Sequence, residues 1–217
     1  MKLTEPHVRR LEEFLTRIQS QTYPEPPSQL HSLVTRQMFE GLKPTFALPA
    51  GARVLDVGCG QGVAMELFVA AGWSPVGITV NAADIEACRA KGFEVSEMDQ
   101  SFLEFEDSTF DLVWCRHCIE HSVMPFFTLS QLVRVLKPGG WLYVEVPAPD
   151  TAAAHQTNRN HYSVLPFSTW GELILRSGIE PLQYRQIPLE LTGGRADLYW
   201  AFWGRRGGGL TGIAPIG

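Results

Sequence analysis

The residues with the clearest capacity for chemistry lie in one short stretch, Asp56-Val57-Gly58-Cys59-Gly60-Gln61-Gly62. Glycine has no Cβ, so a glycine-rich turn lets the backbone approach a ligand closely and directs N–H groups at it. A dinucleotide-binding loop has the spacing G-x-G-x-x-G, which would require a glycine where this chain has Val63. The stretch therefore predicts a ligand-binding loop, but not one of the dinucleotide type.

A second stretch, Cys115–His121, is rich in groups that bind protons or metals. Because neutral imidazole accepts a proton near neutral pH, His117 and His121 are candidate catalytic bases. The alternative for His121 is a structural pair with Glu120. The spacing H-x-x-E-H also occurs in zinc hydrolases, where a helix presents both histidines, but here it follows a predicted strand. We therefore predict no metal ligands, and keep a metal-assisted enzyme using His117, Glu120 and His121 as an alternative.

The elements that must position these residues alternate between strands and helices from Ala52 onward. Strands are predicted at 53–57, 75–79, 93–98, 110–115 and 141–146, with helices at 61–71, 81–91 and 125–136. A helix capped by Ser168 and two strands near 182–191 and 197–203 follow. This order predicts an α/β, Rossmann-like doubly wound sheet, and ligands bind such sheets at the carboxyl ends of the strands.

Two further helices are predicted ahead of this alternation, at residues 4–20 and from Ser28 to Leu42, with a proline-rich break at 23–27. We expect residues 1–45 to form an N-terminal helical cap. The main domain would then span 46–206, and the glycine-rich segment 207–217 would form a flexible tail.

The composition excludes several classes of protein. Eighteen Lys and Arg against 23 Asp and Glu give a net charge of −5, which disfavours a nucleic-acid partner. No apolar run approaches the ~18 residues of a membrane-spanning helix, so no membrane partner is expected. The charged N-terminus does not resemble a signal peptide, and four cysteines are too few for a secreted disulfide scaffold. We expect a cytoplasmic protein with a small-molecule substrate, and leave its oligomeric state open.

Taken together, the motifs resemble the class I S-adenosylmethionine-dependent methyltransferases. Residues 56–62 match the family's acidic-x-G-x-G-x-G loop, and 99–105 with 108–113 resemble its D-x-x-x-L-P-F and S-F-D-L-V segments. Ile119–His121 matches its "lEH", and 132–140 its R-V-L-K-P-G-G. The resemblance runs from Arg53 to Val146 and, more weakly, to Trp203.

The resemblance implies seven strands in the order 3-2-1-4-5-7-6, with strand 7 antiparallel, and S-adenosylmethionine as cofactor. It implies that Asp99 accepts a hydrogen bond from the adenine. Thr79 stands where the family usually has an acidic residue for the ribose hydroxyls, so Asn81 either shares that role or only caps a helix. The implied cofactor-binding residues are Asp56, Gly58, Gly60, Gly62, Thr79, Asp99, Gln100, Ser101 and Cys115.

The function predicted on this basis is methyl transfer from S-adenosylmethionine to an O, N or C nucleophile of a small molecule. The enzyme's main task would be to orient the reactants and exclude water. A non-catalytic partner protein with a methyltransferase fold remains the main alternative. The polar loop Asn158–Tyr162 follows the last parallel strand and is expected either to contact the acceptor or to be an ordinary solvated loop.

Overall fold

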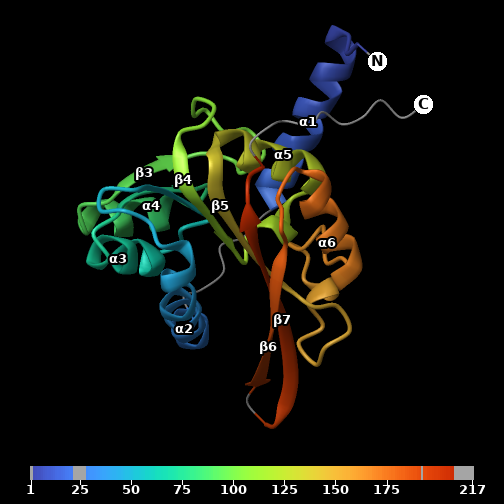
Figure 1. The fold of residues 1–217 in the computed structure, drawn as a ribbon. Coiled ribbons are helices and arrows are strands. Elements are labelled where there is room, and N and C mark those ends of the chain that lie inside the picture. Colours follow the sequence, from blue (N-terminus) through green and yellow to red (C-terminus); the bar gives the residue numbers. More distant parts are fainter. Residues whose placement is uncertain (1, 22–27, 192, 208–217) are drawn as a thin grey trace.

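One seven-stranded sheet with helices on both faces organises the computed structural model, which describes residues 2–21, 28–191 and 193–207 (Figure 1). The strands are β1 Arg53–Val57, β2 Ser74–Thr79, β3 Glu94–Glu97, β4 Phe110–Arg116, β5 Leu136–Pro147, β6 Gln183–Leu191 and β7 Arg195–Arg205. The helices are α1 Glu5–Gln21, α2 Gln29–Phe46, α3 Val63–Ala70, α4 Ala82–Ala90, α5 Pro125–Val135 and α6 Phe167–Arg176, with 3-10 turns η1 Ile119–His121 and η2 His155–Thr157.

The strand order is β3-β2-β1-β4-β5-β7-β6, which confirms the order expected from the sequence. Strands β3, β2, β1, β4 and β5 pair in parallel, and β7 runs antiparallel to both β5 and β6. The parallel pairing brings the carboxyl ends of β1, β2 and β4, at Val57, Thr79 and Arg116, to one edge. The glycine loop and the histidine-rich stretch both start at that edge.

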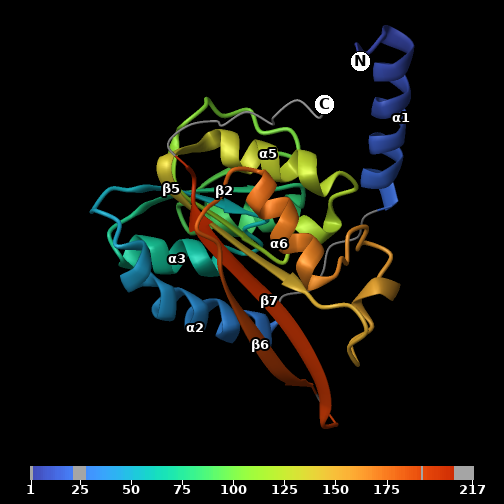
Figure 2. The same cartoon turned by 45° about the vertical axis from the view of Figure 1, so that its right-hand side comes forward.

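Side chains of β4 alternate between two apolar layers, as the period of two in a strand requires. Leu112 and Trp114 join the cluster that contains α2 and α3, whereas Val113 and Cys115 join the one that contains α5 and α6. All four side chains are fully buried. Figure 2 shows these helix pairs on opposite faces of the sheet, which explains why β4 reads as an unbroken apolar run.

Local capping agrees with the sequence in two places and differs in a third. Ser28 accepts a hydrogen bond from the His31 N–H at the start of α2, and Asn81 accepts one from the Ala83 N–H at the start of α4. The prediction that Ser168 caps α6 is wrong. Pro166 occupies the cap position with its restricted backbone, so the helix begins at Phe167.

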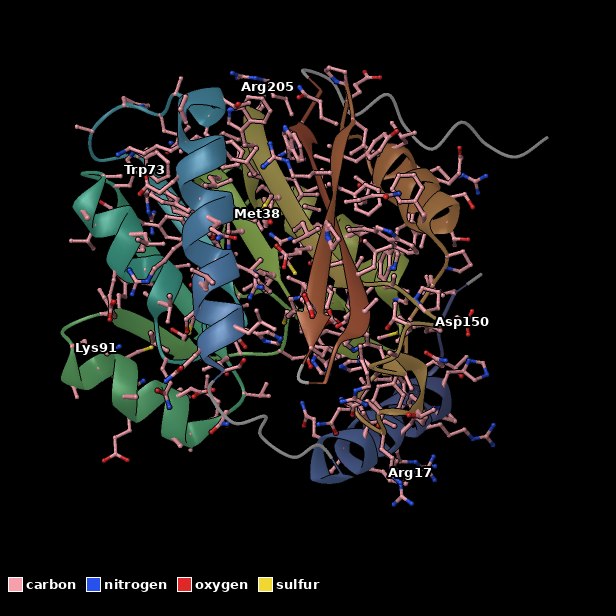
Figure 3. The ribbon with its side chains drawn as sticks, turned by 90° about the horizontal axis from the view of Figure 1, so that it is seen from below. Arg17, Met38, Trp73, Lys91, Asp150 and Arg205 are labelled. Atoms are coloured by element: carbon pink, nitrogen blue, oxygen red, sulfur yellow. The ribbon has the colours of Figure 1, made fainter. Side chains whose placement is uncertain are left out.

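Helix α2 belongs to the core of the sheet domain, and the sequence places it within an N-terminal helical cap of residues 1–45. Phe39 is only 1% exposed, and its ring centroid lies 5.6 Å from those of Phe68 and Trp73. Figure 3 shows α2 lying beside α3 across the sheet, with Met38 and Trp73 labelled. A boundary at 45/46 therefore cuts through one continuous apolar layer.

Helix α1 is far less buried than α2. Of its apolar residues, Val8 and Phe14 are exposed, while Leu11, Leu15 and Ile18 are partly buried. None of the helices in the described ranges is both long and apolar enough to cross a membrane. The predicted break at 23–27 and all of the predicted tail beyond Gly207 lie outside the described residues.

The packing of α2 leads to a stability prediction. Phe39→Ala should lower the free energy of unfolding by about 3–5 kcal/mol, because it opens a cavity between two aromatic rings. Phe14→Ala is the matched control on α1, where the side chain is 36% exposed, and should change it by less than about 0.5 kcal/mol. Urea unfolding measures both. Equal losses in the two variants would contradict a core role for α2.

Candidate functional site

The glycine loop joins β1 to α3 with three left-handed residues. Gly58, Gly60 and Gly62 have φ of 69°, 49° and 82°, a region that favours glycine. A Cβ on Gly58 would lie 2.6 Å from Cys118 Sγ, and one on Gly62 would lie 3.0 Å from the Phe93 ring. A Cβ on Gly60 would meet no atom within 4 Å. Two of the glycines thus permit close packing, and the third faces open space that a ligand can fill.

Asp56 lies on β1 just before this loop and is almost completely buried. Its Oδ2 has no hydrogen-bond partner among the described residues. Burial raises the pKa of Asp56 to about 7, with the charge of Arg116 acting in the opposite direction. Buried polar atoms normally have partners, so this carboxylate fits a donor supplied by a ligand, such as an ammonium group. The residues present therefore fit the amino-acid end of S-adenosylmethionine.

The segment after β3 lies against the same loop through Cys118. The Gln100 side chain donates from Nε2 to the Cys118 carbonyl at 2.9 Å, while its Oε1 is buried without a hydrogen-bond partner among the described residues. Asp99 accepts a hydrogen bond from the Ser101 N–H at 2.7 Å. The Ser101 hydroxyl lies 2.8 Å from that of Thr128 and is buried. Gln100 thus contacts the residue that packs against Gly58, Asp99 holds the turn after β3, and Ser101 turns to the interior.

Thr79 and Asn81 are both engaged in the turn between β2 and α4. The Thr79 hydroxyl oxygen accepts from the Asn81 N–H at 3.2 Å, and Asn81 caps α4. The Asn81 side chain already accepts a hydrogen bond as the cap of α4, whereas the Thr79 hydroxyl still has its proton to donate to a ligand. The acidic residue that usually ends strand 2 is absent here, so ribose recognition would rely on a neutral group.

Past β4, two cationic side chains converge on a buried carboxylate. Arg116 Nε lies 2.9 Å from Glu145 Oε1, and His117 Nε2 lies 3.2 Å from the same oxygen. The Tyr143 hydroxyl donates to the other oxygen of Glu145. Burial would raise the pKa of Glu145, but the charge of Arg116 and the contact with His117 outweigh it and hold that pKa low. Cys115, predicted to adjoin the cofactor, is fully buried just before this cluster.

His117 bridges two carboxylates. Its Nδ1 lies 3.4 Å from Glu120 Oε1, opposite the contact with Glu145, and the side chain is only 12% exposed. Burial acts to lower the pKa of His117, yet the two carboxylates raise it overall. A raised pKa makes the protonated ring easier to keep and so works against a role as proton acceptor. The role of His117 as a catalytic base stays a prediction.

Residues that the sequence did not single out complete this edge. His31, at the start of α2, stacks on His117 with ring centroids 4.8 Å apart, and its Nε2 lies 3.1 Å from the Tyr199 hydroxyl. Burial, followed by the charges of His117 and Arg116, lowers the pKa of His31 to about 4, so the ring is neutral. The His155 ring lies tilted against that of Tyr199, with centroids 5.7 Å apart, and His155 pairs with Asp197. No local spacing links these residues, because they meet only through the fold.

The polar loop after β5 meets the η1 turn at this edge. The Glu120 carbonyl accepts from the N–H groups of both Tyr162 and Ser163 at 2.9 Å. His121 Nδ1 lies 2.9 Å from the Asn160 carbonyl oxygen. The structure thus brings the loop beside the predicted base His121, while its contact with an acceptor stays a prediction.

Three known proteins illustrate what the chain is similar to. The 27-O-demethylrifamycin SV methyltransferase of Amycolatopsis mediterranei is 25% identical over 165 residues, covering 68% of this chain and 61% of that protein. A ubiquinone biosynthesis O-methyltransferase of Thiobacillus denitrificans is 30% identical over 134 residues, covering 58% and 53%. A solved S-adenosylmethionine-dependent methyltransferase from Archaeoglobus fulgidus superposes with a TM-score of 0.68 at 18% identity, covering 80% and 94%.

The chain spans little more than half the length of these two curated relatives. The family model described as "Methyltransferase domain" matches residues 30–179, which include α2 and run to the end of α6. That match covers most of the chain and agrees with the strand order and the glycine loop. The protein therefore belongs to the methyltransferase domain family and has the fold of its class I, S-adenosylmethionine-dependent members.

Proposed function

We propose that this protein transfers a methyl group from S-adenosylmethionine to a hydroxyl group of a small molecule. The observation that carries the proposal is the left-handed glycine loop beside a buried carboxylate, Asp56, that lacks a hydrogen-bond partner among the described residues. The Thiobacillus relative is named an O-methyltransferase, which supports oxygen as the acceptor atom.

In this proposal the cofactor binds along the carboxyl ends of β1, β2 and β3. Gly60 leaves space for its methionine part, and Asp56 balances the ammonium charge. Thr79 offers a hydrogen bond to the ribose, while Asp99 and Gln100 flank the adenine. When bound, the cofactor supplies a methyl group activated by its positive sulfur.

The acceptor would lie against the wall built by His31, His117 and Tyr199. His31 and Tyr199 are hydrogen-bonded to each other and partly fixed by burial, so the wall is rigid. A rigid wall that holds an oxygen in line with the methyl carbon can supply a large part of the rate enhancement, about 7–11 kcal/mol in well-oriented cases. Binding and orientation, rather than acid–base chemistry, would then be the chain's main contribution.

The cellular setting is part of the same proposal. All four cysteines are free thiols, and Cys59, Cys88 and Cys115 are buried. Free thiols are typical of reducing compartments, which favours the cytoplasm.

A transfer assay tests the reaction itself. The protein is incubated with S-adenosylmethionine carrying an isotopically labelled methyl group and with a metabolite extract, and products are analysed by mass spectrometry. We expect the label in a small molecule, as an O-methyl group that survives treatment with acid. Label found only on protein or nucleic acid would contradict the proposal.

A binding prediction follows from Gly60. The parent protein should bind S-adenosylmethionine in the micromolar range, about 8 kcal/mol, by isothermal titration. Gly60→Val should weaken binding at least about tenfold, because the side chain fills the open space before the loop and strains a left-handed backbone. Gly72→Val is the matched control. Gly72 has φ of 81° and equally open surroundings, but follows the far end of α3. Parent-like binding by Gly60→Val would remove the loop from the site.

Asp56 predicts a pH dependence of cofactor binding. Its pKa is raised to about 7, so the group is neutral below that pH and ionised above it. A cationic ligand favours the ionised form, so affinity should rise about tenfold between pH 6 and pH 7.5. The same raised pKa means that the native state binds an extra proton between pH 4 and 7, so stability should fall as pH rises through that window. Asp56→Asn should remove both slopes. Titrations across this range in which parent and variant behave alike would contradict the assignment.

A further inference from the structure

Three side chains at the acceptor edge are not used by the proposed methyl transfer. Glu120, His121 and His161 each offer one ligand atom, and these atoms lie within 4.8 Å of one another. Glu120 and His121 come from η1, and His161 comes from the loop after β5, whose N–H groups donate to the Glu120 carbonyl. Hydrogen bonds thus join two segments that are far apart in the sequence at this cluster.

The two imidazoles are oriented by backbone carbonyls. His121 Nδ1 lies 2.9 Å from the Asn160 oxygen, and His161 Nδ1 lies 3.1 Å from the His155 oxygen. A carbonyl oxygen can only accept, so each Nδ1 carries a hydrogen, and the neutral form of each ring has its lone pair at Nε2. In His161 this lone pair accepts from the Asn158 amide nitrogen, 3.2 Å away, so a bound ion would have to displace that donor. A ring held through Nδ1 with Nε2 as the acceptor is the arrangement found around metal-binding histidines.

Glu120 provides an independent observation. Its side chain is fully buried, yet neither carboxylate oxygen has a hydrogen-bond partner among the described residues. The nearest charge is on His117, whose Nδ1 lies 3.4 Å from Oε1. Buried carboxylates normally accept several hydrogen bonds or coordinate a metal. A buried carboxylate short of donors beside two imidazoles is a set of groups that suits a cation.

We propose that Glu120, His121 and His161 bind a divalent transition-metal ion, with Zn²⁺ the best match to two imidazoles and one carboxylate. Ligand atoms around a tetrahedral Zn²⁺ lie about 3.3 Å apart, so small side-chain rotations close the present spacing. Three protein ligands leave one position open for an outside molecule. His121 and His161 are partly exposed, which gives the ion access from solvent.

This set differs from the one that the H-x-x-E-H spacing suggested. His117 is turned toward Glu145, and η1 is a 3-10 turn rather than a helix presenting both histidines. His161, from another segment, takes the place of the third ligand. The arrangement of a zinc hydrolase is therefore not formed, and the ion would serve the acceptor instead.

A use of this ion in catalysis rests on the proposed function. A hydroxyl bound at the open position loses its proton to solvent more readily, because the ion lowers its pKa. The oxygen then forms a bond to the methyl carbon, and the carbon–sulfur bond breaks with its electron pair returning to sulfur. Cys118, two residues before Glu120, touches the glycine loop, so the ion site and the cofactor site are neighbours.

The test measures metal binding directly. The full chain is stripped with a chelator, titrated with ZnCl₂ by calorimetry, and its metal content is measured after desalting. We expect one ion per chain and at least about tenfold weaker binding in Glu120→Gln and in His161→Gln. His7→Gln is the matched control, since His7 is an exposed histidine on α1. No stoichiometric ion in the parent, or parent-like binding in both cluster variants, would overturn the site.

A second measurement separates the proposed metal site from the proposed methyl transfer. S-adenosylmethionine binding is titrated in the same variants, and we expect it to be unchanged, which also shows that they are folded. Zinc binding without any cofactor binding by the parent would refute the methyl-transfer proposal and leave the ion site intact. Cofactor binding without zinc binding would refute the ion site and leave the methyl-transfer proposal intact.

Discussion

A carboxylate buried within the sheet is the constraint on which the site depends. Glu145 on β5 is fully buried, and an ionised group there requires positive partners. Arg116 and His117 provide them from the end of β4, at 2.9 Å and 3.2 Å. Removing one member of such a buried pair costs roughly 3–5 kcal/mol, so neither cation can leave without a large loss of stability. The ends of β4 and β5 are thereby held together at the edge where ligands would bind.

The path of the chain beyond β4 follows from this pairing. His117 takes a left-handed φ of 48°, and its N–H donates to the Glu145 carbonyl at 3.0 Å, so the chain turns at that residue. Cys118 then packs against Gly58, and its carbonyl accepts from Gln100. Glu120 lies in the middle of the next turn, η1, and its carbonyl accepts hydrogen bonds from the loop after β5. The surroundings of one buried carboxylate thus connect the glycine loop to the turn η1 and to the loop after β5.

What could be predicted from the sequence was set by local rules, and what could not was set by contacts across the fold. Strand order, the glycine loop and the Asn81 cap follow from spacing, turn chemistry and family resemblance. The contacts of His31 with His117 and of His161 with Glu120 depend on how distant segments meet, which spacing does not encode. The packing of α2 on α3 is a further case. An amphipathic pattern indicates that one face of a helix is buried, but not which surface buries it.

Two stacked histidines at the carboxyl-terminal edge of the sheet show how surroundings move the pKa of one type of side chain in opposite directions. Burial lowers the pKa of His31 to about 4, so that ring is neutral, whereas two carboxylates raise the pKa of His117. Because the His31 ring is neutral, the 4.8 Å stacking on His117 involves no like-charge repulsion. A neutral imidazole offers one donor and one acceptor nitrogen, and Nε2 of His31 lies 3.1 Å from the Tyr199 hydroxyl. The wall of His31, His117 and Tyr199 is therefore polar, and in the proposed function it would suit a hydroxyl group better than a purely apolar acceptor.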